Sequence, residues 1–372
     1  MSAMNTVAMG SAEVQELLKC PISGKHLQRL SETEVVQFNQ LIKSGQYYFG
    51  DGNLVSTLYE AVLKVEGEDI YYPVQQDILC LLPDFAMVQD CAQFKIQGDP
   101  LSEDIKQEIK SFYDQIGWQK DEKEAVQFKD ATDSEDLRSV SEEYINQCHL
   151  RLHQHITPKG KYLLDAASGP IQYPAYLNYS RDYQYRICAD LSLTGLLSAR
   201  EKLGNKGIYI LCDITNLPLQ SDQVDTVLSL HTLYHVPQSQ QQSAFDELYR
   251  VLKPGGQSVI VYSWGKNSSL MKVFLLPFKL VKRAFNLFSQ KKPPLYFYAN
   301  TYSWFGQQLK SKYNTKLYVW RSVNVPFLKI YIHKLLAGRL LLKWIYWLEE
   351  KCPKTMGRIG AYPLFVTKKP IS

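Results

Sequence analysis

The chain has 372 residues, of which 45% are hydrophobic and 21% are charged. These proportions are typical of soluble globular proteins, and the length suffices for two or three domains with a sizeable core. No run of about 18 uninterrupted apolar residues occurs, so no membrane-spanning helix is predicted. The first residues lack a basic start followed by an apolar core, which argues against a secretory signal.

The cysteine content and the charge distribution indicate the cellular compartment and the kind of partner. Seven cysteines are scattered without pattern, which predicts reduced thiols and a cytoplasmic protein. Residues 266–372 contain 20 Lys and Arg but only two acids, so this third carries about +18, whereas residues 1–265 carry about −13. The division predicts that the C-terminal third faces phospholipid, nucleic acid or a charged substrate. The alternative is that the two parts of the chain attract each other.

The first two segments differ in their patterns. Residues 1–95 contain strand-like runs, "LVSTLYEAVLKV" and "DIYYPVQQDILCLLP", separated by turn residues, and predict a small β-rich unit. Residues 96–160 are polar and helical in pattern. The stretch "SEDIKQEIKSFYDQIGW" predicts a helix with Ser102 as its N-cap.

Short, nearly continuous apolar runs alternate with helix-like segments from residue 160 to residue 264. The runs are "KYLLDAA", "YRICAD", "GIYILCD", "VDTVLSL" and "QSVIVY". Such runs indicate strands buried on both faces of a parallel sheet with helical crossovers. The stretch "SAFDELYRVLKPGG" predicts a helix that stops at Pro-Gly-Gly.

The basic C-terminal third contains an amphipathic helix at 268–290. At 100° per residue, aromatic and aliphatic side chains lie opposite one basic face, formed by Lys272, Lys279, Lys282 and Arg283. Strands are predicted at 316–322 and 362–368. A basic face beside an apolar face suits an anionic bilayer surface. The alternative is a cap that covers the substrate pocket.

The stretch "LLDAASGP" ends the first predicted core strand, where a doubly wound sheet binds its ligand. Its small residues let the backbone approach a ligand closely. Asp190 ends the second run, where a carboxylate can accept both hydroxyls of a ribose, and Asp213 ends the third, placed to meet an adenine amino group. One acid at a strand end is often a helix cap. Three acids in register, with Asp165 the first, favour a cofactor site.

The stretches "LLDAASGP", "CADLSLTGLLSAR", "CDITNLPLQSDQVDTVLSLHTLYHV" and "ELYRVLKPGG" resemble the class I S-adenosylmethionine-dependent methyltransferases of the small-molecule type. The resemblance covers roughly residues 110–264 and continues weakly to the C-terminus. It implies an α/β fold with a Rossmann-like seven-stranded sheet, and S-adenosyl-L-methionine as cofactor. It also implies the cofactor-binding candidates Asp165, Ala167, Ser168, Gly169, Asp190, Leu191, Asp213, Ile214, Leu230 and Tyr113.

The loop departs from the family pattern Asp-x-Gly-x-Gly-x-Gly. Ala167 and Ile171 replace the first and third glycines, whereas Gly169 remains. Alanine is tolerable unless the position needs a positive φ, so cofactor affinity is the quantity in question. Nicotinamide binding would require G-x-G-x-x-G, which is absent here.

The stretch "SLHTLYHV" follows the fourth strand, and the resemblance places it beside the sulfonium. His231, Tyr234 and His235 are therefore the catalytic candidates, with His235 as a base for an acceptor hydroxyl. The alternatives are that the histidines pack structurally or orient water, and that transfer runs largely on alignment. The Asn/Asp-Pro-Pro-Tyr signature of amino-group methylation of adenine or glutamine is missing, which argues against those substrates. The predicted acceptor atom is oxygen or carbon. "FYDQIGW", with Tyr113 and Trp118, resembles the helix that closes over the cofactor, and core packing is the alternative.

The N-terminal unit resembles the zinc-ribbon activators that partner methyltransferases of tRNA and translation factors, on the stretches "LLKCPISGKHL" and "YYPVQQDILCLLP". Ser23 replaces the second cysteine of the opening Cys-Pro-x-Cys, and Cys20, Cys80 and His26 make no tetrahedral set, so no metal is predicted. The unit would be a scaffold or a substrate-docking domain. The histidines of "CHLRLHQH" are predicted to be surface or cap residues: His149, His153 and His155.

The predicted organisation has four parts. Residues 1–95 form the degenerate ribbon and 96–160 the helical linker with the cofactor-covering helix. Residues 161–264, 300–322 and 360–372 form the core, and basic helical insertions lie at 265–299 and 323–359. The predicted function is methyl transfer to a small-molecule or lipid-like acceptor in the cytoplasm, with peripheral association at the inner face of the membrane. The alternatives are an RNA or translation-factor methyltransferase and a non-catalytic binding module, with nucleic acid ranked behind the membrane as a partner.

Overall fold

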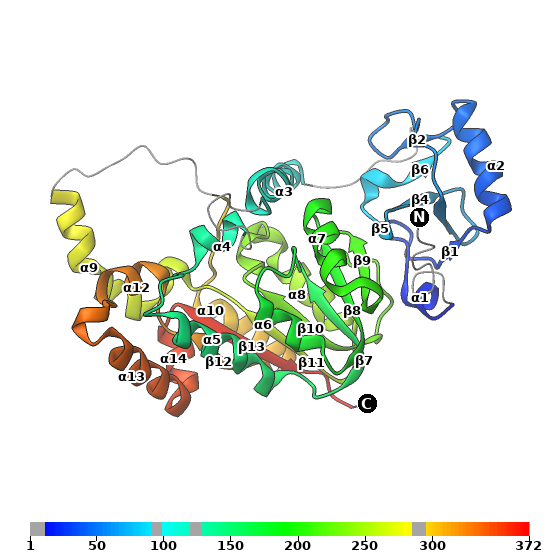
Figure 1. The fold of residues 1–372 in the computed structure, drawn as a ribbon. Helices are drawn as coiled ribbons and strands as arrows, with labels where there is room; N and C mark the ends of the chain where they lie inside the picture. The colour runs from blue at the N-terminus through cyan, green and yellow to red at the C-terminus, as the bar shows by residue number, and fades with distance from the viewer. Residues whose placement is uncertain (1–11, 91–98, 120–127, 285–294, 372) are drawn as a thin grey trace.

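The computed structural model describes residues 12–90, 99–119, 128–284 and 295–371. A twisted sheet runs through the centre of the molecule with helices on both faces (Figure 1). Its core strands are β7 (Gly160–Ala166), β8 (Tyr183–Asp190), β9 (Gly207–Leu211), β10 (Val224–Leu230), β11 (Leu252–Val261), β12 (Lys316–Arg321) and β13 (Tyr362–Lys368). These confirm the strands predicted for the core and for the C-terminal third.

The core strands lie in the order β9-β8-β7-β10-β11-β13-β12. Neighbouring strands are parallel, except that β13 runs antiparallel to both β11 and β12. The chain therefore winds outward from β7 in both directions. The strand order reverses between β7 and β10, which is where such sheets bind ligands.

The sheet has more strands than the seven predicted, because it continues into the N-terminal unit. That unit contains β1 (Leu27–Arg29), β2 (Tyr48–Phe49), β3 (Ala61–Val65), β4 (Tyr71–Gln75), β5 (Ile78–Cys80) and β6 (Met87–Val88). Strand β5 pairs in parallel with β9, with Leu79 opposite Ile210, and the two units share one 13-stranded sheet. An apolar strand beside the open edge of β9 satisfies backbone groups that would otherwise face water.

The N-terminal unit also contains two helices, α1 (Ala12–Leu17) and α2 (Glu32–Lys43). Helix α2 begins with a capping box in which Ser31 and Glu34 satisfy each other's backbone amides. Cys20 is buried, and its thiol lies 3.5 Å from the hydroxyl of Tyr72. Among the described residues, no group of three His, Cys, Asp or Glu is arranged to hold a metal ion.

Helix α3 (Pro100–Phe112) starts one turn earlier than predicted. Its N-cap is Asp99, whose carboxylate accepts the amide of Ser102 at 3.2 Å, so Ser102 is not the cap. A π-helical turn, η3 (Tyr113–Gly117), continues it. The linker then forms α4 (Lys129–Ser134), α5 (Glu142–Arg151) and η4 (Leu152–His155).

Three further helices and their short extensions connect the core strands: α6 (Pro174–Leu177), η5 (Asn178–Ser180), α7 (Leu193–Leu203), η6 (Gly204–Lys206), η7 (Leu233–His235), η8 (Gln238–Gln240) and α8 (Gln241–Arg250). Helix α8 ends before Val251, and β11 begins at Leu252, so Pro-Gly-Gly lies inside the strand. The register of β10 against β11 jumps there, and Gly255 has a φ of +80°. These glycines form an irregularity in the strand instead of stopping the helix.

The C-terminal third contributes β12, β13 and a group of helices at the end of the molecule opposite the N-terminal unit (Figure 1). The helices at that end are α9 (Ser269–Ala284), α12 (Val325–Tyr331), η11 (Lys334–Leu336), α13 (Gly338–Lys351) and α14 (Pro353–Ile359). The consecutive segments α10 (Tyr302–Trp304), η10 (Phe305–Lys310) and α11 (Ser311–Tyr313) lie instead beside α8, which Tyr313 contacts. The predicted helix at 268–290 is described as far as Ala284, and the rest of it lies outside the described residues. No helix in the described ranges is long and apolar enough to cross a membrane.

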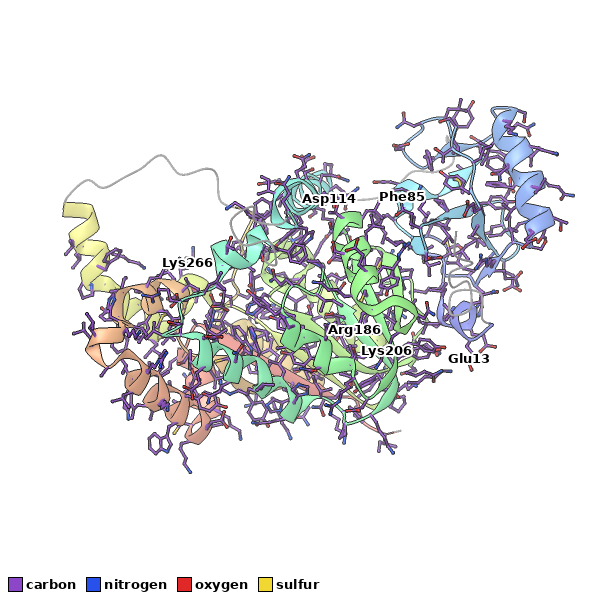
Figure 2. The ribbon with its side chains drawn as sticks, in the orientation of Figure 1. Glu13, Phe85, Asp114, Arg186, Lys206 and Lys266 are labelled. Atoms are coloured by element: carbon purple, nitrogen blue, oxygen red, sulfur yellow. The ribbon has the colours of Figure 1, made fainter. Side chains whose placement is uncertain are left out.

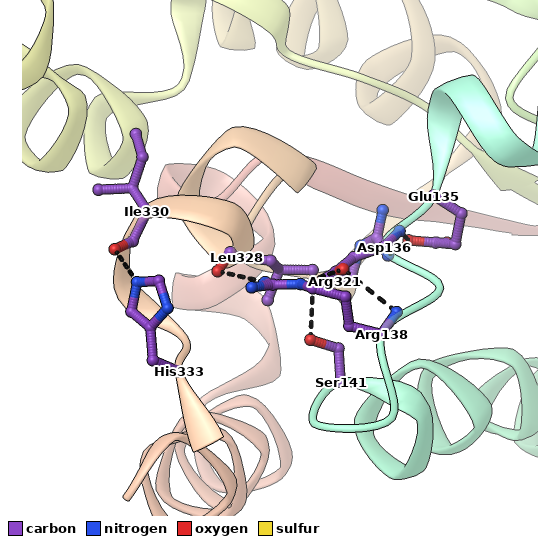
Figure 3. A network of polar contacts seen from close by, with 8 residues as sticks. All are labelled: Glu135, Asp136, Arg138, Ser141, Arg321, Leu328, Ile330 and His333. Atoms are coloured by element: carbon purple, nitrogen blue, oxygen red, sulfur yellow. Dashed lines mark hydrogen bonds and ion pairs between the residues drawn. The ribbon is translucent and has the colours of Figure 1, made fainter. Parts of the chain in front are cut away.

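Buried ion pairs fix these helices to the core. Arg321 at the end of β12 donates to Glu135 at 2.6 Å (Figure 3). In the same segment, Arg138 bridges Asp136 and the carbonyl of Leu328 in α12 at 2.8 Å. A second anchor holds α13, where the buried carboxylate of Glu349 accepts from Tyr144, Arg151 and Ser322. These contacts give α12 and α13 defined positions.

Candidate active site

One pocket opens at the carboxyl ends of β7, β8, β9 and β10, beneath α3 and η3. It brings together acids from three successive strand ends and histidines that follow the fourth. Eleven of the predicted site residues line it: Tyr113, Asp165, Ala167, Ser168, Asp190, Leu191, Asp213, Ile214, Leu230, His231 and His235. The parallel register of the strands accounts for this gathering, because their carboxyl ends meet at one edge of the sheet.

The loop after β7 keeps the backbone of a glycine-rich turn without most of its glycines. Ala167 has a φ of +59°, Gly169 of +49° and Ile171 of +51°. The left-handed region costs a residue with a Cβ roughly 1–2 kcal/mol. Ile171 is buried in the core, which offsets the cost there. The substituted positions therefore do need a positive φ, and the loop stores strain beside the pocket.

Asp165 lies at the bottom of the pocket and is held by a buried arginine. The guanidinium of Arg186, on β8, donates through Nε at 3.1 Å and through Nη2 to the same carboxylate oxygen. Another Arg186 nitrogen donates to the carbonyl of Tyr176 at 2.7 Å. Figure 2 shows Arg186 within the sheet. The pair keeps a charged carboxylate in an apolar interior, since each ion compensates the other.

Asp190 accepts two backbone amides, from Gly169 and from Ser192, both at 2.8 Å. It thereby ties the loop after β7 to the start of α7. Burial raises the pKa of Asp190 to about 6, against the lowering effect of those two amides. A carboxylate has about four lone-pair positions, so two remain for ligand hydroxyls.

Asp213 is paired with a residue that the sequence did not single out. Its carboxylate lies 2.6 Å from the ammonium of Lys106 on α3, and its other oxygen accepts the amide of Thr215 at 2.8 Å. Burial would lower the pKa of Lys106, but Asp213 and Glu103 raise it above its ordinary value. The ion pair joins the covering helix to the end of β9.

The covering segment closes the pocket through aromatic side chains. The rings of Tyr113 and Trp118 stack with centroids 4.7 Å apart. The indole of Trp118 lies on Gly169, where a Cβ would come within 2.6 Å of a ring carbon. Asp114 accepts from the hydroxyl of Ser192, and Figure 2 shows Asp114 on this segment above the sheet. The indole N–H of Trp118 is buried and has no partner among the described residues, which leaves a donor for a bound ligand.

His231 and His235 form the opposite end of the pocket. Nδ1 of His235 lies 2.7 Å from the carbonyl oxygen of Tyr296, which can only accept, so Nδ1 carries the hydrogen and Nε2 has the free lone pair. Burial lowers the pKa of His235 to about 4, and burial together with Arg321 holds that of His231 well below its ordinary value. Both rings are therefore neutral at pH 7 and offer hydrogen-bond acceptors.

Behind these histidines lies a second layer of polar and aromatic groups. His231 meets the ring of Trp320 at 4.5 Å, and His149 stacks on that ring at 5.8 Å. His149 is buried, so the prediction of a surface or cap residue is wrong for it, because aromatic rings enclose it on several sides. His153 and His155 are less buried and also lie on tyrosine rings. Nε2 of His149, Nε of Arg321 and Oε1 of the pocket-lining Gln172 have no partner within the described part of the chain.

Two predicted site residues do not line the pocket. Gly169 lies behind it and donates its amide to Asp190. Tyr234 packs between Phe297 and Tyr262. Lys106, Gln172 and Arg186 were not among the predicted site residues. Arg186 could have been predicted to have a buried acidic partner, because a lone basic residue inside an apolar strand requires one. Lys106 and Gln172 carried no such signal.

Comparison with known proteins adds to this geometry. Residues 164–260 match the family model described as a methyltransferase domain. Among solved structures, the chain is similar to a Haemonchus contortus phosphoethanolamine N-methyltransferase 2 in complex with S-adenosyl-L-methionine, at 17% identity and a TM-score of 0.37. That likeness covers 60% of this chain and spans about half (52%) of that enzyme's length.

A second solved structure is a geranyl diphosphate methyltransferase in complex with GPP and sinefungin. The identity is 13%, the TM-score is 0.38, and 59% of this chain and 76% of that chain are covered. A search of curated proteins found no significant match.

The family match covers β7 to β11, the strands whose ends form the pocket. The pocket also fits the cofactor of that domain: Asp190 and Asp213 have lone pairs left for hydroxyl and amino groups, and the indole N–H of Trp118 is unpartnered. Residues 164–260 therefore match a methyltransferase domain, and the pocket at the carboxyl ends of its strands has acceptors and a donor available for S-adenosyl-L-methionine.

Proposed function

We propose that this protein transfers a methyl group to an oxygen or carbon atom of a small-molecule or lipid-like acceptor that binds beside His231 and His235. The observation that carries the proposal is the continuity of one pocket from Asp190 and Asp213 to two neutral imidazoles. Cofactor at the acidic end would place an acceptor at the imidazole end.

S-adenosyl-L-methionine supplies an electrophilic methyl group on its sulfonium. The chain contributes binding, alignment and removal of water. Asp190 would accept the ribose hydroxyls and Asp213 the adenine amino group. Ile214 would contact the adenine ring, and Tyr113 and Trp118 line the pocket on the side of the covering helix. Alignment of this kind accounts for much of the rate of a displacement reaction.

For a hydroxyl acceptor, His235 would act as the base that accepts the hydroxyl proton. Its free Nε2 accepts the O–H of the acceptor while Tyr296 fixes the ring through Nδ1. The proton moves to Nε2 as the new carbon–oxygen bond forms, because the O–H becomes strongly acidic at that point. A weakly basic imidazole therefore suffices. Gln172 offers an unpartnered carbonyl oxygen that orients a second polar group of the acceptor.

The first experiment is calorimetric titration of the full chain with S-adenosyl-L-methionine, S-adenosylhomocysteine and NADH. Binding of the first two without NADH is expected. Turnover is then followed as S-adenosylhomocysteine release with hydroxyl-bearing and carbon acceptors, lipids first. His235→Ala should reduce turnover on a hydroxyl acceptor by about 10²-fold or more and leave cofactor affinity unchanged. His153→Ala, at a more exposed histidine outside the pocket lining, is the matched control.

Other results would overturn the proposal. Cofactor binding without turnover on any acceptor would favour a non-catalytic binding module, consistent with the strain at Ala167 and Ile171. Methylation of RNA or of a translation factor in place of small acceptors would favour the macromolecular alternative. Equal losses in the two histidine variants would remove His235 from the reaction.

A further inference from the structure

Large apolar side chains form a stripe on the outer face of α13. Three of them recur at helical spacing along α13 and are strongly exposed: Leu340 by 68%, Trp344 by 56% and Trp347 by 52%. Leu336, in η11 just before the helix, is 73% exposed. Leu335 beside them is 96% exposed. The opposite face of α13 is already buried through Leu342, Ile345 and Glu349. The described part of the chain therefore packs without burying the side chains of the stripe.

Helix α9 adds a second apolar surface at the same end of the molecule (Figure 1). Its buried contacts are Met271 and Leu275, and the carbonyl of Phe274 accepts the hydroxyl of Tyr331 in α12. Leu270 is partly buried against the core. Six further large apolar side chains of the helix are exposed: Val273, Phe274, Leu276, Phe278, Leu280 and Val281. We call α9, η11 and α13 together the docking surface.

Basic residues surround the stripe, and the acidic residues named below are buried or lie beside basic side chains. Lys334, Arg339, Lys343 and Lys351 are exposed on η11 and α13, as are Lys272 and Lys279 on α9. Glu349 is buried, Glu350 accepts Arg151 at 2.7 Å, and Glu143 lies 4.0 Å from Lys343. Among the described residues, the Lys and Arg side chains of the C-terminal third that pair with acids of residues 1–265 are Lys312, Arg321 and Lys369, and Lys343 at 4.0 Å. Of these, only Lys343 belongs to α13. The charge of the docking surface therefore faces outward.

We infer that the docking surface binds the face of an anionic phospholipid bilayer, with α13 in the plane of the membrane. A bilayer accepts both features at once: leucine and tryptophan side chains enter the boundary of the acyl chains, and the flanking ammonium groups meet lipid phosphates. A second copy of the chain would set two positive surfaces against each other. Nucleic acid would pair with the lysines but leave the leucines in water.

The anchoring of α12 and α13 makes the surface preformed. The Arg138–Leu328 contact holds α12 against the core (Figure 3), and the contacts of Glu349 with Arg151 and Ser322 hold α13 there, without any membrane. The inference goes beyond the proposed methyl transfer and does not depend on it. It extends the predicted helix at 268–290 to a second helix, whose tryptophans mark the depth at which the protein would sit.

The test is flotation of the full chain with vesicles of phosphatidylcholine alone or with added phosphatidylglycerol. Wild type should float only with the anionic vesicles, and high salt should weaken the association. The double variant Trp344→Ser with Trp347→Ser should lower the bound fraction at least about tenfold, as should Lys334→Gln with Arg339→Gln and Lys351→Gln. The control is Val36→Ser with Leu54→Ser, two exposed apolar residues on the N-terminal unit, and should bind like wild type.

Thermal unfolding of each variant, matched to wild type, confirms that the fold is kept. The inference is overturned if wild type binds no anionic vesicle, or if the control variant loses as much binding as the tryptophan variant. It is also overturned if light scattering shows a dimer that the tryptophan variant abolishes, or if RNA binds this surface and vesicles do not. Because no cofactor enters the assay, its failure leaves the proposed activity untouched.

Discussion

Side chains at the floor of the pocket are buried and held by specific partners, whereas the large apolar side chains on the outer face of α13 are exposed. At the pocket, Asp165 is held by Arg186 and Asp190 by two backbone amides. On α13, leucines and tryptophans face solvent with their inner neighbours already packed. The first region depends on positions fixed within a few tenths of an ångström, and the second on the chemical character of a surface. Substitutions should therefore be costly and specific at the pocket, and mild for the fold at the docking surface.

Arg186→Met should have the largest effect, because it leaves the carboxylate of Asp165 buried without its counter-ion. Removing one partner of a buried pair costs about 3–5 kcal/mol of unfolding free energy. Urea unfolding of the cofactor-free protein measures it. The double variant Arg186→Met with Asp165→Asn should recover much of the loss. A single-variant loss below about 1 kcal/mol would show that Asp165 does not need its partner.

Gly169→Ala should weaken cofactor binding by at least about tenfold, since its Cβ would lie 2.6 Å from the ring of Trp118. Overpacking costs about 1–3 kcal/mol, and the positive φ adds about 1 kcal/mol. Gly45→Ala, at the end of α2, is the control, with a φ of +73° and nothing within 4 Å of the new Cβ. Calorimetry should show normal affinity for the control. Equal affinity losses would assign the effect to backbone strain alone.

Cofactor affinity should fall as the pH drops below about 6. The pKa of Asp190 is raised to about 6 by burial, so its carboxylate is charged above that pH and protonated below it. Only the charged form is a full acceptor for ribose hydroxyls, so affinity is highest above pH 6. Titrations between about pH 7 and 5 measure this. Asp190→Asn should bind about tenfold more weakly at pH 7 and lose the pH dependence in this window. A persisting slope in that variant would point to another group.

Ala167→Gly and Ala337→Gly compare one small change in the two regions. Both alanines have a positive φ, +59° at the pocket and +53° beside α13. Glycine removes that strain, and its greater freedom in the unfolded chain offsets part of the gain, so each variant should gain about 0.5–1 kcal/mol. Thermal unfolding measures the gain. Only Ala167→Gly should change cofactor affinity, and a change in Ala337→Gly would link the two regions.

Leu335→Ala should have the smallest effect on the fold, within about 0.5 kcal/mol of wild type, since this side chain is 96% exposed. Leu342→Ala, on the buried face of α13, is the comparison and should cost about 2–5 kcal/mol. Urea unfolding of both variants reports the difference. A large loss in Leu335→Ala would mean that another part of the chain covers the stripe.

Much of the core fold could be predicted from local patterns. Strands buried on both faces read as continuous apolar runs, and the acids at or just beyond the last residues of β7, β8 and β9 mark their carboxyl ends. The extent of the sheet could not be predicted, because the pairing of β5 with β9 depends on which edge is open in three dimensions. The N-cap of α3 was missed although the sequence carries a local signal for it, because Pro100 at the first helical position marks Asp99 as the cap.

The sequence by itself determined the order of elements, the acids and small residues at the strand ends, and the concentration of basic charge in the last third. The helix and strand patterns can be recognised because the backbone geometry imposes a fixed local spacing on side chains that share a face. Tertiary structure alone decided that Lys106 meets Asp213, that Ala167 and Ile171 adopt a positive φ, and that His149 is buried behind His231. It also decided which apolar residues of α13 remain exposed. Contacts between residues far apart in the chain set each of these, and no local spacing encodes them.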